Sequence, residues 1–287
     1  MISVVIPVYD GAAVLPTTIP SVLRLHADEI VWVDDGSRDD TPELLAEAAS
    51  GVPTVRVVTL PRNRGRAAAR NAGGAASSGD VLVFFDADVE PPRDAAAALA
   101  EALNSPNAVA SVARLDPVAS EPADPYQDYA SNFPRGPARG LSPGQPIDWR
   151  FFLSGACAVR RAAFDAVGGF PEAVPYGEDL AFGCRLSRLG PDGLRLAGTT
   201  VRLHDLGDLD RALENASQFG QSAARFDEPC PGGGAGRVRS SRRLGPVAAL
   251  VAAPLRVLID RLPPGATRRR AVRYLLAATA IRAARRA

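Results

Sequence analysis

Three apolar segments in the first ninety residues each run directly into acidic residues or a turn. They are Ser3–Asp10 (SVVIPVYD), Val31–Thr41 (VWVDDGSRDDT) and Asp80–Asp88 (DVLVFFDAD). Short apolar runs bounded by polar turns are typical of buried parallel strands. In an open α/β sheet, ligands bind beyond the carboxyl ends of such strands. The sequence therefore predicts an α/β fold with a binding site where these acids gather.

Helical patterns alternate with strands through the first hundred residues, which is typical of βαβ units and of a mostly parallel sheet. Strands are predicted at Ile2–Val8, Ile30–Val33, Thr54–Thr59 and Val81–Phe85, and helices at about 12–25, 42–49, 65–76 and 93–103. Residues 116–148 are rich in Pro, Gly, Asp and Ser, so we expect a long loop or lid there. After it we expect an ordered apolar segment at Phe152–Val159, helices near 160–167, 178–189 and 208–226, and a strand near Leu194–Leu203.

Two carboxylates, Asp86 and Asp88, stand two positions apart directly after the strand Val81–Phe85. In an extended backbone, side chains two residues apart point to the same side. Hard oxygen ligands of this kind suit Mg²⁺ or Mn²⁺, with phosphate oxygens and water completing the coordination. An isolated D-x-D is far more often a loop that caps the next helix. The position at a strand end favours the metal site here.

A fourth motif, Gly177–Leu180 (GEDL), places Glu178 and Asp179 at the start of a predicted helix. A carboxylate within hydrogen-bond reach of an alcohol can remove its proton as the alcohol attacks. The same two acids are also suited to the positive end of the helix dipole. Both roles are open, since a base can lie at a helix start.

These four motifs, in this order, resemble those of the family 2 glycosyltransferases over about residues 2–205. Enzymes of this family have the GT-A fold and move a sugar from a nucleoside diphosphate to an acceptor hydroxyl. The resemblance implies a GT-A (Rossmann-like), mostly parallel sheet flanked by helices, with a C-terminal helical basic tail. It also implies an inverting, metal-dependent, hexosyltransferase-type enzyme. The expected domains are a catalytic domain at 1–228, with its nucleotide-sugar half at about 1–115 and its acceptor half at 116–228, and a Gly/Pro linker and amphipathic basic tail at 229–287.

On the acceptor and metal side, the resemblance assigns four acidic positions. It implies that Asp179 is the catalytic base and that Glu178 orients the acceptor or the loop. It implies that Asp88 binds Mg²⁺ or Mn²⁺ directly, whereas Asp86 contacts the ribose or the metal. His204, which follows the predicted strand, corresponds to a histidine that approaches the metal or the diphosphate in many relatives. A structural role for His204 is the alternative.

On the donor side, the resemblance implies that Asp34 and Asp35 bind the nucleoside. Asp35 is the closer match to the carboxylate that accepts a hydrogen bond from the base, although the pair could instead cap the turn at Gly36. Pro7 and Tyr9 leave the first strand beside this pair, and Tyr9 could stack on a base.

Basic and aromatic residues complete the candidate site. Arg66 begins the third helix and matches a nucleotide-contacting position, since a helix N-terminus with Arg is suited to a diphosphate. Arg70 lies one turn later, where a solvated surface position is the expectation. Trp149 is expected to stack on the acceptor sugar or, equally, to belong to the core.

The charge distribution is strongly asymmetric although the net charge is only +1. Residues 237–287 contain 13 Arg and one acid, Asp260, for a net charge of +12, so the rest carries −11. Apolar residues at Val272, Leu275, Leu276 and Thr279 follow helical spacing among these arginines. This pattern is typical of a helix that lies on an anionic membrane surface. The alternative is a helix packed on the catalytic domain.

The cysteines and the N-terminus favour a cytoplasmic protein, peripheral on the inner face of the membrane if the tail binds lipid. Cys157, Cys184 and Cys230 form no C-x-x-C pair, which indicates neither a zinc site nor a disulfide framework. The N-terminus lacks the pattern of a basic segment, an apolar stretch and a cleavage site.

The leading hypothesis is therefore a transferase that uses a nucleoside-diphosphate sugar, with a UDP-sugar favoured, and an acceptor hydroxyl, with a lipid-linked acceptor as one option. A sugar-nucleotide nucleotidyltransferase of related fold is one alternative, but those enzymes carry a Gly-rich loop after the first strand, where this chain has PVYDG. A non-catalytic, membrane-recruited binding module is the other. Nucleic acid is not an expected partner, because the basic tail lacks interleaved aromatic residues.

Overall fold

The computed structural model describes residues 1–105, 107–118, 124–132, 140–190, 192–204, 207–222, 225–226 and 254–284. It divides the chain into two compact units. The first comprises residues 1–116, 135–172 and 178–205, and the second comprises residues 117–134, 173–177 and 206–287. The domain boundary expected at 228/229 stays a prediction.

The N-terminal half of the first unit is a parallel sheet. Its strands are β1 (Ile2–Val8), β2 (Glu29–Asp34), β3 (Val55–Thr59) and β4 (Val81–Phe85), paired in the order β3-β2-β1-β4. These are the four predicted strands, confirmed to within one residue at each end. Every residue of β2 is buried, as expected for a strand that is covered on both faces.

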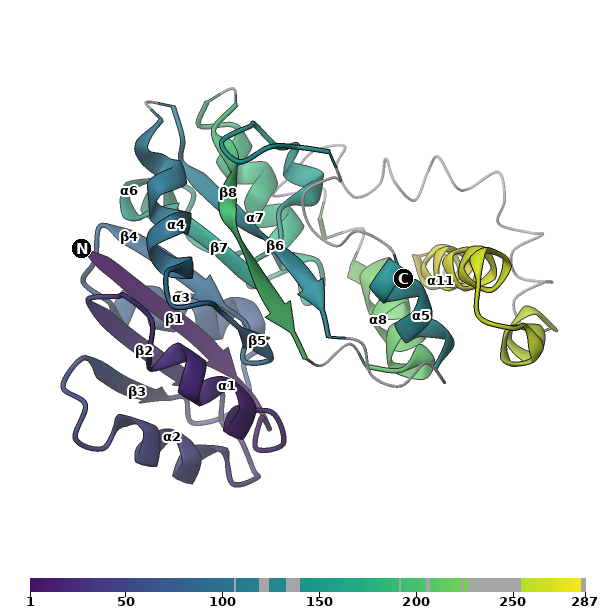
Figure 1. Cartoon of the computed structure of the whole chain (residues 1–287), viewed down its shortest axis with the longest axis horizontal. Coiled ribbons are helices and arrows are strands. Elements are labelled where there is room, and N and C mark those ends of the chain that lie inside the picture. The colour runs from purple at the N-terminus through teal and green to yellow at the C-terminus, as the bar shows by residue number, and fades with distance from the viewer. Residues whose placement is uncertain are drawn as a thin grey trace. The chain divides into compact units, whose positions relative to one another are not determined.

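Antiparallel strands extend this sheet beyond β4 (Figure 1). β7 (Ala156–Arg160) pairs antiparallel with β4, and β6 (Ala110–Pro117) pairs antiparallel with β7. The long strand β8 (Leu194–Leu203) pairs antiparallel with the two-residue strand β5 (Val89–Glu90). Within the described residues, the whole sheet has the order β3-β2-β1-β4-β7-β6-β8-β5. The sheet is therefore parallel in its first half and mixed overall.

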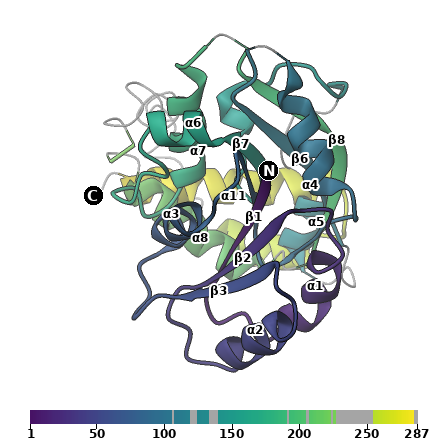
Figure 2. The same cartoon turned by 90° about the vertical axis from the view of Figure 1, so that its left-hand side faces the viewer.

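Helices cover both faces of this sheet. The helical elements of the first unit are α1 (Leu15–Val22), α2 (Thr41–Ala49), α3 (Arg66–Ala76), α4 (Ala95–Glu101), α6 (Arg161–Ala166), α7 (Glu178–Ser187) and the 3₁₀ turns η1 (Ala102–Asn104) and η2 (Trp149–Phe151). α3 and α4 lie on opposite faces (Figure 1, Figure 2). The missing side chain of Gly73 lets α3 pack close to the sheet. A Cβ at this position would lie only 2.2 Å from Cγ1 of Val5.

The segment expected to be a loop, 116–148, contains regular structure. β6 extends to Pro117, and α5 (Pro125–Asn132) is a helix that the sequence pattern does not predict. The pattern misses α5 because its residues, PYQDYASN, are mostly polar. The expectation of a loop is therefore wrong at residues 116–117 and 125–132.

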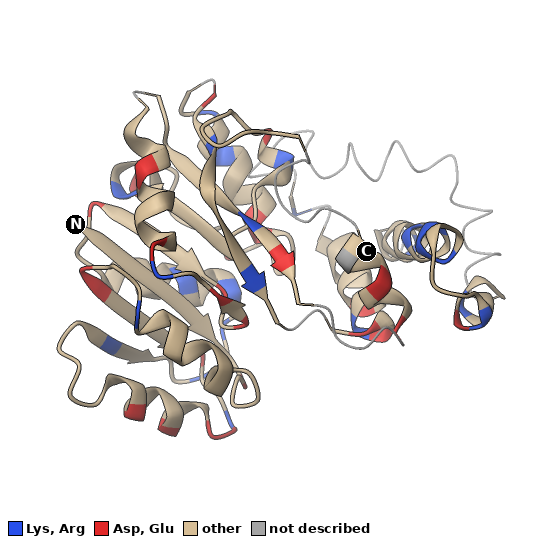
Figure 3. Ribbon diagram, viewed as in Figure 1, with Lys and Arg blue, Asp and Glu red and all other residues tan. Residues whose placement is uncertain are grey.

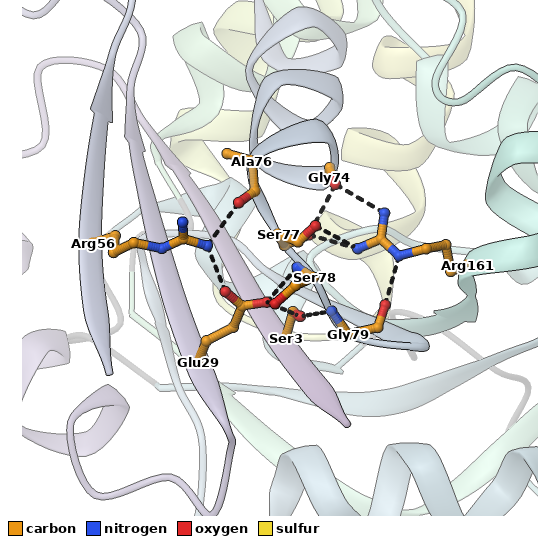
Figure 4. Close-up of polar contacts among 9 residues, drawn as sticks. All are labelled: Ser3, Glu29, Arg56, Gly74, Ala76, Ser77, Ser78, Gly79 and Arg161. Atoms are coloured by element: carbon orange, nitrogen blue, oxygen red, sulfur yellow. Dashed lines mark hydrogen bonds and ion pairs between the residues drawn. The ribbon is translucent and has the colours of Figure 1, made fainter. Parts of the chain in front are cut away.

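A buried polar network joins the amino ends of the parallel strands (Figure 4). The hydroxyls of Ser3 and Ser78 donate to the Glu29 carboxylate, and Arg56 forms an ion pair with it. Arg161 binds the turn before β4 through the carbonyl oxygens of Gly74, Ser77 and Gly79. Burial opposes the charge of Glu29, but these hydrogen bonds outweigh it and lower the pKa of Glu29 to about 2.

The second unit packs helices α5, α8 (Leu209–Ser222) and α11 (Ala266–Ala284) with the helical residues 254–261. Its core contains Leu209, Ile259, Val272 and Leu275, with two tyrosines of α5 against it. Asp128 of α5 accepts hydrogen bonds from Arg268 and Arg269, both at 3.1 Å. Figure 3 shows the arginines of α11 in blue. The described part of the tail, residues 254–284, contains helix at 254–261 and α11, as predicted, and apolar side chains of α11 pack within this unit.

Two further expectations bear on the environment of the chain. None of the helices in the described ranges is long and apolar enough to cross a bilayer. Cys157 is a buried free thiol, whereas Cys184 is disulfide-bonded. The cysteine spacing indicates no disulfide framework and thus does not predict the disulfide at Cys184, so the cysteines no longer favour a reducing compartment.

Candidate active site

The carboxyl ends of β1 and β2 bring the predicted nucleoside-binding residues together. Val8 and Asp34 are register partners, and the N–H of Asp35 donates to the carbonyl oxygen of Val8 at 2.8 Å. Tyr9 follows Val8 with 44% of its surface exposed, so its ring is available to a ligand. Asp10 has a positive φ of 47°, which is uncommon for a residue with a side chain.

Asp34 and Asp35 are both almost completely buried, and each has backbone partners. Oδ1 of Asp34 accepts a hydrogen bond from the N–H of Ser37 at 2.9 Å. The two oxygens of Asp35 accept from the N–H groups of Arg64 and Gly65, both at 2.8 Å. Burial raises the pKa of Asp35 above its usual value, and these bonds offset only part of the rise. The predicted capping of the Gly36 turn is present at Asp34, and nucleoside binding stays a prediction.

Asp35 also shapes the start of α3. By binding the N–H groups of Arg64 and Gly65, it fixes the turn that leads into the helix. Gly65 has a φ of +90°, a conformation that residues with a side chain rarely adopt. Arg66, the first residue of α3, is exposed and lies at the helix terminus where anions bind. Its nucleotide-contacting role stays a prediction.

Arg70 is the functional candidate that the sequence pattern misplaces. It is only 1% exposed, so the expectation of a solvated surface arginine is wrong. Its two terminal nitrogens bind Oδ1 of Asp86 at 2.6 Å and Oε1 of Glu178 at 3.0 Å. The guanidinium also lies over the ring of Phe170, 5.3 Å from the ring centre. The spacing Arg66–Arg70 places both arginines on one helix face, but only the fold reveals that Arg70 is buried whereas Arg66 is exposed.

Glu178 and Asp179 begin α7 and lie in the same cluster as Arg70. Glu178 is buried, whereas Asp179 is partly exposed and accepts a hydrogen bond from the N–H of Leu180 at 2.7 Å. Burial, followed by the negative charge of Glu178, raises the pKa of Asp179 to about 7. A carboxylate with such a pKa is suited to accepting a proton near neutral pH.

Asp86 lies against a glycine that leaves room for its carboxylate. The N–H of Asp86 donates to the carbonyl oxygen of Gly155 at 3.0 Å. A Cβ at residue 155 would lie 2.8 Å from Oδ2 of Asp86. With Oδ1 bound to Arg70, the Asp86 side chain still has 40% of its surface exposed. One of its oxygens therefore remains available to a ligand.

His204 lies beside the Asp86–Asp88 turn because β8 pairs with β5. Its N–H donates to the carbonyl oxygen of Asp88 at 2.9 Å, and its Nε2 lies 2.7 Å from Oε2 of Glu90. The described residues contain no group of three or more Asp, Glu, His or Cys side chains arranged to hold a metal ion. Asp86 and Asp88 carry the hard oxygen ligands that a divalent cation prefers, and binding of a cation by them stays a prediction.

Trp149 begins η2 and packs against the hydrophobic core with part of its ring accessible. The guanidinium of Arg150 lies 4.8 Å from the centre of its ring. The core role left open by the sequence is thus present, and acceptor stacking stays a prediction.

Comparison with known proteins agrees with the motif order. The model for Glycosyl transferase family 2 matches residues 3–168, more than half of the chain. The undecaprenyl-phosphate 4-deoxy-4-formamido-L-arabinose transferase of Pseudomonas fluorescens (strain Pf0-1) is 46% identical over 109 residues, which are 35% of this chain and 32% of that relative. The transferase of the same name from Yersinia pestis (strain Pestoides F) is 39% identical over 99 residues, covering 32% and 30%. The chain thus matches about a third of the length of these curated relatives.

Solved structures share the fold across nearly the whole chain. A mannosyltransferase from Pyrobaculum calidifontis in complex with GDP-Man and Mn²⁺ has a TM-score of 0.60 at 20% identity, covering 96% of this chain and 85% of that one. TarS 1–349 of S. aureus in complex with UDP has a TM-score of 0.57 at 17% identity, covering 99% and 89%. At these identities the likeness shows the GT-A fold alone. Because the family model spans more than half of the chain and the fold agrees with it, this protein belongs to glycosyl transferase family 2.

Proposed function

We propose that the protein transfers a sugar from a nucleoside-diphosphate sugar to an acceptor hydroxyl, with inversion at the anomeric carbon. The observation that carries the proposal is the placement of Asp179, whose pKa is raised to about 7, in one cluster with Asp86 at the carboxyl edge of the sheet. A base for the acceptor thereby lies close to a carboxylate for the donor. Family membership favours this function over a nucleotidyltransferase or a non-catalytic module.

The donor nucleoside is proposed to bind at the ends of β1 and β2. Tyr9 would stack on the base beside Pro7, and Asp35 would accept a hydrogen bond from it, with Asp34 holding the turn. Arg66 would contact the diphosphate from the N-terminus of α3. The structural neighbours were solved with GDP-Man or UDP. We favour a UDP-sugar, and isothermal titration calorimetry with UDP, GDP and dTDP in Mn²⁺ tests this choice.

Asp88 and Asp86 are the residues that would hold Mg²⁺ or Mn²⁺. When bound, the cation stabilises the negative charge that develops on the leaving diphosphate. Asp88 is proposed as the direct ligand, and Asp86 as the residue shared between the ribose and the cation. His204 would act through the backbone hydrogen bond that fixes Asp88. Asp88→Ala is expected to weaken Mn²⁺-dependent nucleotide binding more than Asp86→Ala. Wild-type activity that survives EDTA would contradict the metal assignment.

Asp179 is proposed to take the proton of the acceptor hydroxyl as its oxygen attacks the anomeric carbon. Glu178, held by Arg70, would stay beside Asp179, whose pKa is raised by burial and by the negative charge of Glu178. Trp149 would lie at the acceptor side. A single displacement with one base gives inversion, and NMR of the product anomer tests this directly.

A lipid phosphate is a second candidate acceptor, because the matched relatives are named undecaprenyl-phosphate transferases. The two acceptors make different demands on Asp179. A hydroxyl must lose its proton, whereas a phosphate monoester, with a second pKa near 6, is already largely ionised at neutral pH. Asp179→Asn should therefore abolish transfer to a hydroxyl but spare much of the transfer to undecaprenyl phosphate. Assaying this variant with both acceptors decides between them.

Association of the tail with an anionic membrane surface is part of the proposal. It is supported by the net charge of +12 in residues 237–287, since each basic residue near such a surface contributes about 1 kcal/mol. Because Val272 and Leu275 are buried in the second unit, the contact would rest on exposed arginines such as Arg270 and Arg282. Sedimentation with anionic vesicles at low and high salt tests it. No binding at low salt would end this part of the proposal.

A further inference from the structure

Arg70 is completely enclosed although it carries a full charge. Its exposed fraction is 1%, which places it among the largest fully buried side chains of the protein. A buried charge is costly unless it is paired and hydrogen-bonded. The contacts of Arg70 therefore explain why the fold tolerates it.

The partners of Arg70 come from two distant parts of the sequence. Asp86 follows β4 on the side proposed for the donor, and Glu178 begins α7 on the side proposed for the acceptor. Each binds a different terminal nitrogen, at 2.6 Å and 3.0 Å. The planar guanidinium can meet two carboxylates at fixed angles, which a lysine ammonium cannot do.

We infer that Arg70 is a positioning residue that sets the donor-side carboxylate Asp86 and the acceptor-side acid Glu178 in one geometry. The inference rests on the proposed function, because it assigns the two carboxylates to the two substrates. A displacement of either carboxylate would misplace one reactant relative to the other. A misplacement of 1 Å can reduce a rate by about 10²-fold.

A purely structural arginine in the same unit makes a different set of contacts. Arg161 binds the carbonyl oxygens of Gly74, Ser77 and Gly79 and the hydroxyl of Ser77, at the opposite edge of the sheet (Figure 4). None of its hydrogen bonds in the described part of the chain goes to a carboxylate. Arg161→Lys is therefore a matched control for the loss of a multiply bonded arginine without any change in the candidate site.

The charge of Arg70 also acts on Asp179. The groups that face Asp179 are Glu178 from its own helix, Arg70 from α3, Asp86 after β4 and the Cys157 thiol of β7. Arg70 supplies the positive charge among them and lowers the pKa of Asp179, against the larger effects of burial and Glu178. Loss of this charge should raise the pKa of Asp179 further, whereas a lysine at residue 70 should change it little.

The test compares Arg70→Lys, Arg70→Met and Arg161→Lys in the full chain. Arg70→Lys is expected to lower kcat/KM by about 10²-fold with the pH profile unshifted, because charge remains while geometry is lost. Arg70→Met should in addition move the acidic limb of the profile to higher pH. Arg161→Lys should lose stability and keep the wild-type kinetics. If Arg70→Lys also keeps wild-type kcat and KM, Arg70 is merely structural and the inference is wrong.

A second measurement does not depend on turnover. Carbon-13 NMR of Asp-labelled protein, with the Asp179 signal assigned through Asp179→Asn, follows its titration directly. A rise in the pKa of Asp179 in Arg70→Met supports the inference even if no sugar donor is found. Failure to find a sugar donor would count against the proposed function alone. An unchanged pKa would overturn the electrostatic link. If Arg70→Met does not fold, Arg70→Met/Glu178→Gln removes one unpaired carboxylate and allows the same comparison against Glu178→Gln.

Discussion

The parallel strands of the first unit begin at the amino edge of the sheet and end at its carboxyl edge. Acids lie beside arginines at both edges, but their pKa values shift in opposite directions. At the amino edge, Glu29 receives hydrogen bonds from two serines and Arg56, and its pKa falls to about 2. At the carboxyl edge, Asp179 lies beside a second acid, and its pKa rises to about 7. Glu29 is thus ionised at neutral pH, whereas Asp179 can exchange its proton there.

The difference follows from how the hydrogen-bond donors are distributed. The amino edge supplies donors to a single carboxylate, which stabilises the charged form. The carboxyl edge divides one arginine between Asp86 and Glu178, and Asp179 receives one backbone N–H, from Leu180. Completed hydrogen bonding at one edge thus serves stability, and incomplete charge compensation at the other serves chemistry.

Asp179→Asn gives the sharpest test of this contrast and the largest expected effect. Loss of a general base lowers the rate of transfer to a hydroxyl by about 10²–10⁴-fold. Nucleotide affinity should stay near that of the wild type, because Asp179 acts on the acceptor. Steady-state kinetics together with calorimetry measure both quantities. Wild-type turnover in this variant would remove Asp179 from the mechanism.

Glu29→Gln should affect stability and leave chemistry alone. The amide cannot accept all the hydrogen bonds that the carboxylate does, and an unsatisfied buried donor costs about 1–3 kcal/mol. Chemical denaturation should show this loss at pH 7, with unchanged kcat for the folded fraction. A fall in kcat without a loss of stability would contradict the hypothesis that the amino edge contributes to stability and the carboxyl edge to chemistry.

The pH dependence of the same variant sharpens the comparison. The folded pKa of Glu29 is lowered from 4.5 to about 2, so its contribution to stability is present above about 4.5 and is lost as the pH falls toward 2. The difference in free energy of unfolding between the wild type and Glu29→Gln should therefore shrink on acidification. Melts at pH 7, 4 and 3 follow it.

At the carboxyl edge the sign is reversed. The pKa of Asp179 is raised from 3.8 to about 7, so its folded environment favours the protonated form, and stability is lost as the pH rises through about 7. Asp179→Asn should consequently raise the melting temperature at pH 8 and leave it nearly unchanged at pH 4. A variant that melts below the wild type at pH 8 would show that the charged Asp179 stabilises the fold.

Gly155→Ala should have the smallest effect and act on the donor side only. The added methyl group would lie 2.8 Å from Oδ2 of Asp86, so this carboxylate must shift. We expect a few-fold rise in KM for the donor and a loss of stability of about 1 kcal/mol. Gly190→Ala is the control, because a Cβ there meets no atom within 4 Å. If Gly155→Ala and Gly190→Ala have equal kinetic constants, Gly155 plays no part in the candidate site.

Periodicity and turn chemistry predict the parallel half of the fold well. The strands β1–β4 are mostly apolar runs, with Arg56 the one charged residue away from their ends, so their bounds follow largely from hydrophobicity. β6 escapes prediction because Ser111, Arg114 and Asp116 interrupt its apolar residues. The apolar spacing of α11 predicts the helix, but spacing does not tell whether a membrane or a protein covers it. The structure assigns Val272 and Leu275 to contacts within the second unit.

The acids of the candidate site could be predicted from the sequence, but the buried position of Arg70 could not. Asp86, Glu178 and Asp179 follow from motifs that stand at strand or helix ends. Arg70 could not be distinguished from a surface residue, because its burial depends on Phe170 and Glu178, both about a hundred residues away in the sequence. Long-range pairing of this kind leaves no periodic trace.

Arg56 lies on the terminal strand of the sheet, and this position bears on the solubility of the protein. β3 is the terminal strand of the described sheet, so one side of its backbone has no neighbouring strand. Its sequence, VRVVT, is rich in β-branched residues, a composition that promotes pairing between copies of a chain. Arg56, the second residue of this short run and half exposed, adds a charge that disfavours such pairing. The same residue that secures Glu29 thereby also guards the protein against edge-to-edge aggregation.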